Sequence, residues 1–198
     1  MRKGQVTEPV PDGRRGADAS ADEAALLRRI AAGDRLAFET LYRGYFPRLT
    51  RFLERVIRSP QMVEEVLNDA MMVVWRKAAT FNGQSKVSTW IFAIAYRKAL
   101  KALKRFDEPL EADEQLFESP GPGPESLLMQ RQRFSLLMQQ IGRMSPEHRA
   151  VIELTCYHGC AYREIAQILG CPVDTVKTRM FHARKRLRQF LSDRKEEI

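Results

Sequence analysis

Residues 144–191 read MSPEHRAVIELTCYHGCAYREIAQILGCPVDTVKTRMFHARKRLRQFL, and this stretch decides the fold of the C-terminal part. Ser145-Pro146 favours the start of a helix, which the apolar spacing carries to His158-Gly159. A short helix over 162–169 follows, Gly170-Cys171-Pro172 breaks it, and a long helix is expected over about 173–191. A short helix, a tight turn and a second helix form the helix-turn-helix pattern.

The long helix carries basic and hydroxyl side chains on its open faces. Its first turns would fit the major groove of DNA, where Lys, Thr, Arg and His can reach base edges. The later arginines suit phosphates, which set affinity and register. The alternative is a solvated basic helix in a bundle that binds protein.

Residues 22–105 also show helical spacing and no strand pattern, which predicts a small helical bundle. A short helix is expected over about 23–32 and a longer one around 38–57, kinked or divided at Pro47. Ser59-Pro60 begins a helix that ends near Ala79. Phe81 to Gln84 form a loop, and a last helix covers about 88–104.

This last helix combines basic and aromatic residues. Cations beside aromatic rings suit unstacked bases, since each base offers a π-face and each nucleotide a phosphate. The alternative is that Trp90 and Phe92 belong to the core and the lysines are merely solvated.

Between the two blocks lies an acidic segment. The chain has 198 residues and a net charge of +8, yet 106–126 hold seven acids and no Lys or Arg. Three prolines within 119–124 forbid a regular helix, so 106–124 are expected to be a flexible linker. It is either a solvated spacer or an acidic strip for a positively charged channel on a partner. Residues 1–22 lack periodicity and are expected to form a flexible tail.

Several classes of protein are excluded by composition. No stretch approaches a membrane span, no signal peptide is recognisable, and three cysteines are too few for a disulfide scaffold, so we expect a cytoplasmic protein. Cys156, His158, Cys160 and Cys171 do not follow a common zinc spacing, and core packing is favoured over a metal or redox site. No catalytic or phosphate-binding motif is present, so we expect neither an enzyme nor a cofactor.

The whole pattern resembles an extracytoplasmic-function (ECF) sigma factor, the compact class of bacterial RNA polymerase sigma subunit. The matching strings are AFETLYRGYFPRL (37–49), VEEVLNDAMMVVWRKAATF (63–81), STWIFAIAYRKALKAL (88–103) and the 144–191 stretch quoted above. The resemblance implies an all-α protein of two small domains, a region 2-like domain over 23–105 and a region 4-like helix-turn-helix domain over 125–198. It covers about 24–191.

The resemblance also implies three binding surfaces. The −35 promoter element would be bound by Thr175, Lys177, Thr178, Arg179, Phe181, His182 and Arg184. The −10 element would be held and melted by Phe81, Asn82, Trp90, Tyr96, Arg97, Lys98 and Lys101. Core polymerase would dock on Glu65, Leu67, Asn68, Asp69 and Met71. The linker would thread toward the RNA exit channel.

Two residues depart from the family pattern. Many relatives have Asn where this chain has Arg97, which changes the expected −10 preference because Arg reads a base differently. Many also have Ser or Thr where Ala161 stands, and Ala cannot cap a helix, a loss of about 1 kcal/mol.

The implied partners are core RNA polymerase, promoter DNA and an anti-sigma factor, which is often membrane-anchored and would then hold the chain at the inner membrane face. The alternative is a helix-turn-helix regulator that acts without joining the polymerase. The first block favours the sigma factor, since a regulator would place a ligand pocket or receiver domain there.

Overall fold

The computed structural model describes residues 13–105 and 125–193, and within these ranges the chain is helical with no strand. This confirms the predicted all-α class. The N-terminal helices are α1 (Gly13–Ala31), α2 (Arg35–Ile57), α3 (Pro60–Lys77), the short 3-10 helix η1 (Ala78–Thr80) and α4 (Val87–Arg105). The C-terminal helices are α5 (Glu125–Gly142), α6 (Pro146–Cys156), α7 (Tyr162–Leu169) and α8 (Val173–Asp193).

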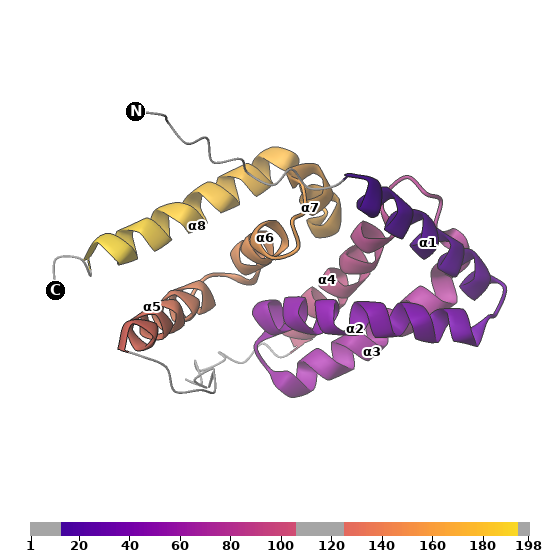
Figure 1. The fold of residues 1–198 in the computed structure, drawn as a ribbon, viewed down its shortest axis with the longest axis horizontal. Coiled ribbons are helices and arrows are strands. Elements are labelled where there is room, and N and C mark those ends of the chain that lie inside the picture. The colour runs from indigo at the N-terminus through magenta and orange to yellow at the C-terminus, as the bar shows by residue number, and fades with distance from the viewer. Residues whose placement is uncertain (1–12, 106–124, 194–198) are drawn as a thin grey trace, which may run out of the picture.

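Helices α2, α3 and α4 form the N-terminal bundle, with α1 lying across α2 (Figure 1). Leu49, Phe52 and Leu53 on α2 are fully buried, as the helical spacing predicts. Asp34 caps α2 by accepting a hydrogen bond of 3.0 Å from the Ala37 N–H. This bond, together with one from Arg29, lowers the pKa of the Asp34 carboxyl.

One expectation for this bundle is wrong. Helix α1 begins at Gly13, so residues 13–22, expected to be tail, lie in a helix. The run ADASADEAA (17–25) explains this, because alanine has the highest helix propensity and no proline follows Pro11 until α2. Of the two alternatives at Pro47, the division of the helix does not occur, because α2 continues as one element and the burial of its apolar face outweighs the loss of one backbone hydrogen bond.

The C-terminal bundle follows the sequence closely. Helix α7 has the predicted bounds, and Gly170 ends it in the left-handed conformation (φ 63°) that glycine accepts without strain. Ala161 stands at the N-cap position without a side-chain bond, and Glu164 instead accepts the Ala161 N–H at 2.8 Å. The acidic linker lies outside the described residues.

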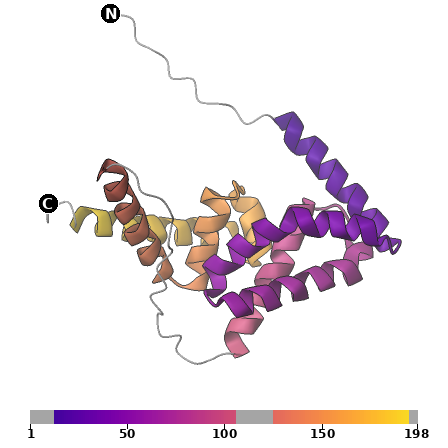
Figure 2. The same ribbon diagram turned by 60° about the horizontal axis from the view of Figure 1, so that its bottom comes forward.

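The two bundles pack against each other rather than standing apart. Helix α6 packs on α2, and α7 packs on α4, and both pairs lie side by side in the two views (Figures 1 and 2). Their buried apolar residues form one continuous cluster from Leu27 to Met180. None of the described helices is both long and apolar enough to cross a membrane.

Candidate nucleic-acid interface

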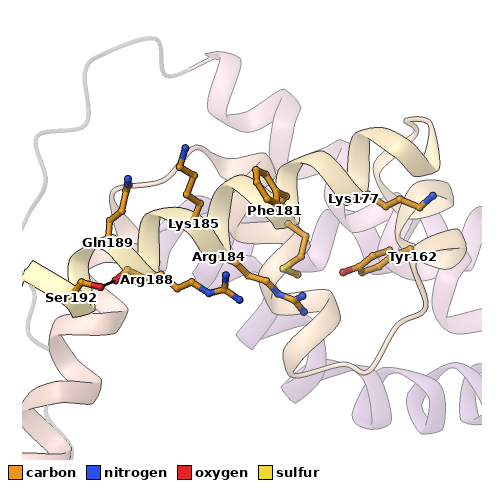
Figure 3. Close-up of a pocket in the computed structure, with 9 residues that line it drawn as sticks. Tyr162, Lys177, Phe181, Arg184, Lys185, Arg188, Gln189 and Ser192 are labelled. Atoms are coloured by element: carbon orange, nitrogen blue, oxygen red, sulfur yellow. Dashed lines mark hydrogen bonds between the residues drawn. The ribbon is translucent and has the colours of Figure 1, made fainter.

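The outer face of α8 is basic and open. Val176, Met180 and Ala183 anchor the opposite face in the core, which turns the intervening positions outward. A shallow groove on this surface is lined by side chains of α8 and by Tyr162 at the start of α7 (Figure 3). Its residues are Tyr162, Lys177, Met180, Phe181, Arg184, Lys185, Arg188, Gln189 and Ser192.

Most of the residues predicted to read the −35 element are accessible. The exposed ones are Lys177, Thr178, Phe181, His182 and Arg184. Phe181 is 64% exposed, which is unusual for a large apolar ring and leaves it free to contact a thymine methyl group. Thr175 and Arg179 are half-buried, and Arg179 Nη1 points back at the helix-turn-helix turn, 3.7 Å from Cys171 Sγ.

At the predicted −10 surface, Phe81 and Trp90 form an aromatic pair with ring centroids 5.6 Å apart. Both rings are half-buried, so each keeps an accessible part. Asn82 is exposed between them in the chain, and its Oδ1 accepts the Gln84 N–H at 3.1 Å, which shapes the loop. Arg97 and Lys101, which lie about two and three turns after Trp90 on α4, are exposed.

Two other predicted −10 residues are already engaged. Lys98 Nζ donates to Asp69 Oδ2 of α3 at 2.8 Å. Tyr96 is only 2% exposed, and burial raises the pKa of its phenol to about 12. Phe92, the ring whose role the sequence left open, is 1% exposed and belongs to the core. In this arrangement Tyr96 and Phe92 are therefore closed to a base.

The predicted polymerase-docking residues divide between surface and core. Glu65, Asn68 and Asp69 are exposed on α3, whereas Leu67 and Met71 are each 1% exposed. Leu67 and Met71 therefore pack inside the bundle in this structure, and the accessible residues of the predicted set are the polar ones. Because 66, 67, 70, 71 and 74 form the inward stripe, the adjacent positions turn outward.

Sequence reasoning missed the apolar part of this surface. Met72 on α3 is 47% exposed and lies one turn beyond Asn68. Asn68 Oδ1 accepts a hydrogen bond of 3.1 Å from Tyr42 of α2, whose ring lies 5.7 Å from that of Phe46, itself 44% exposed. The helical spacing of the apolar residues could have shown that Met72, and not Met71, lies on the outer face of α3. Nothing in the sequence, however, indicates that Tyr42 bonds to Asn68.

The cysteines occupy unremarkable positions. Cys160 and Cys171 are half-buried and pack against the apolar core, as expected for Cys160, and burial raises the pKa of Cys160 to about 11. Cys156 is exposed at the end of α6.

Family comparisons match both bundles. The family described as Sigma-70 region 2 matches residues 41–107, and Sigma-70, region 4 matches residues 134–187. The ECF RNA polymerase sigma factor RpoE of Cereibacter sphaeroides is 33% identical over 175 residues, which cover 86% of this chain and 96% of that protein. The ECF RNA polymerase sigma-E factor of Escherichia coli is 30% identical over 171 residues, covering 81% of this chain and 89% of that protein.

Two solved structures share the fold. CnrH, in complex with the cytosolic domain of CnrY, aligns with a TM-score of 0.64 at 22% identity, covering 87% of this chain and 98% of that one. The Bartonella quintana sigma factor RpoE, in complex with the anti-sigma factor NepR, aligns with a TM-score of 0.59 at 26% identity. The alignment covers 78% of this chain and 96% of that one. With both sigma regions present in order, and with relatives of 30% and 33% identity covered over at least 89% of their length, the chain belongs to the ECF family of RNA polymerase sigma factors.

Proposed function

We propose that this sigma factor binds core RNA polymerase and directs it to promoters through two DNA surfaces of different chemistry. One observation supports this division most directly. The outer face of α8 is basic and suits duplex DNA, whereas Phe81 and Trp90 offer rings beside the basic α4, which suits unstacked bases. A regulator that only binds duplex DNA has no need of the second surface.

The region 4-like domain, over 125–198, would recognise the −35 element. Lys177, Thr178, Phe181 and His182 lie near the start of α8, where a recognition helix reaches base edges. Arg184 and Arg188 follow one and two turns later and would contact phosphates, which hold the helix in register.

The region 2-like domain, over 23–105, would hold the melted −10 element. Flipping one base costs a few kcal/mol of stacking, which restacking on Phe81 or Trp90 can offset. Arg97 and Lys101 would hold the phosphates of that strand, with Arg97 altering base preference where many relatives carry Asn. None of these steps needs a catalytic side chain in this protein, because the polymerase makes the RNA.

The exposed face of α3 would bind the polymerase. Glu65, Asn68 and Asp69 supply polar groups, and Met72 supplies the apolar contact that an interface centre requires. The similar Bartonella quintana RpoE, solved in complex with the anti-sigma factor NepR, supports an anti-sigma factor as the expected regulator. The chain would then act in the cytoplasm, and a membrane-anchored anti-sigma factor would hold it at the inner membrane face.

Run-off transcription with purified core polymerase tests the proposal. A genomic DNA library serves as template, and the 5′ ends of transcripts are sequenced. We expect discrete start sites that share two upstream elements, and loss of these starts in Phe181→Ala together with Arg184→Ala. The matched control is Arg163→Ala on the exposed side of α7, which should keep them. If no start depends on the added protein and gel filtration shows no binding to core polymerase, the proposal fails.

A further inference from the structure

The contact between the two bundles buries both charged and aromatic side chains. We call it the interdomain seam and define it by Arg51, Phe52 and Phe92 on the N-terminal side and Arg149, Glu153 and His158 on the C-terminal side. Its polar part centres on Arg149 of α6, which is 7% exposed. Its guanidinium donates across the seam to the carbonyl oxygens of Arg55 and Val56, both at 2.6 Å.

Glu153 completes the polar part from the same helix. It is 7% exposed, and its Oε1 accepts from Arg51 Nε of α2 at 2.8 Å. Arg55 Nε lies 3.9 Å from the other carboxylate oxygen. A buried carboxylate and a buried guanidinium are costly unless they are paired. Here the arginine partners of Glu153 and two of the four carbonyl partners of Arg149 come from the opposite domain.

The apolar part is formed by His158, just beyond α6. Its ring packs edge-on against Phe92 of α4, with centroids 4.8 Å apart, and lies 6.3 Å from Phe52 of α2. The charged groups around it are Arg48 and Arg51 of α2 and Glu153 of α6, whose Oε1 is 3.9 Å from Nε2. The seam thus combines a packed ring with paired charges, as a domain interior does.

An exposed ion pair extends the seam to α7. Lys86, before α4, places Nζ 2.7 Å from Glu164 Oε1. Helix α7 itself packs on both α4 and α8. Because neighbouring helices pack 8–10 Å apart, the axes of α4 and α8 are at most about 20 Å apart where α7 joins them.

At this separation the two domains cannot contact the −35 and −10 elements of one promoter at the same time. The −35 and −10 elements are about 25 base pairs apart, which at 3.4 Å per step is roughly 85 Å. The 19 residues of 106–124 can span at most about 65 Å, so the chain is long enough for the domains to move apart. Opening would also uncover Tyr96.

We propose that the interdomain seam is an autoinhibitory contact: the free chain closes on itself, and binding to polymerase and promoter requires it to open. The proposal rests on the promoter function proposed above. The apparent affinity for polymerase and promoter is then reduced by the fraction of molecules that are open. Weakening the seam should therefore strengthen promoter use at low protein concentration.

Arg51→Glu tests the seam with little risk to folding, since the Arg51 side chain is 40% exposed and its ion-pair partner Glu153 is across the seam. The matched control is Arg43→Glu, on the same helix, where the arginine is 77% exposed and pairs with Glu39. Circular dichroism and thermal melts check that both variants fold. A zero-length carbodiimide cross-linker joins Lys86 to Glu164 as an amide in the closed state, and mass spectrometry measures the yield.

Wild-type protein and Arg43→Glu should give the Lys86–Glu164 cross-link, and Arg51→Glu should lower it at least about fivefold, since it leaves the buried Glu153 facing a second carboxylate. The Lys98–Asp69 cross-link, within one domain, should not change. In run-off transcription, Arg51→Glu should reach half-maximal output at a several-fold lower concentration than wild type.

Absence of the Lys86–Glu164 cross-link in the wild-type chain overturns the proposal. So does an Arg51→Glu variant that loses the cross-link without any change in the concentration needed for transcription. If neither protein starts transcription while the cross-link still responds to Arg51→Glu, the promoter function is overturned and the closed state itself stands.

Discussion

Replacing Arg149 by Met should destabilise the folded chain, because the carbonyl groups that accept hydrogen bonds from Arg149 lose their donor. The Arg149 guanidinium donates to four carbonyl oxygens: Arg55 and Val56 across the seam, and Gly142 at 3.2 Å and Met144 at 2.7 Å within its own domain. Burial, with Arg58 nearby, lowers the pKa of Arg149 to about 10, so it remains charged at neutral pH.

The size of the effect follows from these bonds. A hydrogen bond to a charged group contributes about 1.5–3 kcal/mol, and a buried unpaired carbonyl costs about 1–3 kcal/mol. Met keeps the apolar contacts, and opening of the seam lets water reach the Arg55 and Val56 carbonyls. We therefore expect a loss of about 3 kcal/mol, or a hundredfold in the folding equilibrium. Arg149→Lys should rescue little, because an ammonium cannot reproduce the planar fork.

Urea unfolding, followed by tryptophan fluorescence and by circular dichroism, measures this loss of stability. Trp75 and Trp90, the only tryptophans of the chain, lie in the N-terminal bundle, so fluorescence reports that bundle while circular dichroism reports both. Wild-type transitions should coincide, whereas in Arg149→Met the circular dichroism transition should move to lower urea than the fluorescence transition. A loss below about 1 kcal/mol with coincident transitions would refute the reasoning, and exposed Arg163→Met is the control.

Three further predictions concern single residues. Burial, with Arg48 and Arg51 nearby, lowers the pKa of His158 to about 4. The contribution of the neutral His158 ring to the free energy of unfolding is therefore complete above the unfolded pKa of about 6.5 and is lost as the pH falls toward about 4. Urea melts between pH 4 and 7 should show this slope, and His158→Phe should flatten it. Ala161→Ser should raise the free energy of unfolding by about 1 kcal/mol by capping α7, and an unchanged urea midpoint would contradict this. Arg184→Ala should weaken duplex binding about equally at all sequences and reduce the salt slope of log K by about 1 in a titration of fluorescent promoter DNA.

The helices of the C-terminal bundle could be predicted because local signals agree there. Proline at the first turn of α6, the Gly170 stop and the basic outer face of α8 all act within a few residues. At Pro47 the local signal left a kinked helix and two separate helices open, and the buried contacts of α2 with α3 and α4 explain why the helix continues.

The surfaces were harder to predict than the helices. Helical spacing separates an inner from an outer face, yet it left adjacent methionines undecided, and Met71 is inside while Met72 is outside. The seam could not be predicted at all. Arg149 bonds residues more than ninety positions earlier in the chain, and in the sequence it resembles any solvated arginine of a helix. His158 drew attention as a metal ligand, although its ring serves as an apolar contact.

The continuous core described above has a consequence for how long an unoccupied molecule survives in the cell. A chain that opens without a partner exposes Phe52, Phe92 and Tyr96, which are all within 2% of full burial in the closed state. Proteases cleave locally opened chains in proportion to how often they open. If the seam opens as proposed, we expect it to couple activity to turnover: closed molecules should persist longer than molecules that open without polymerase.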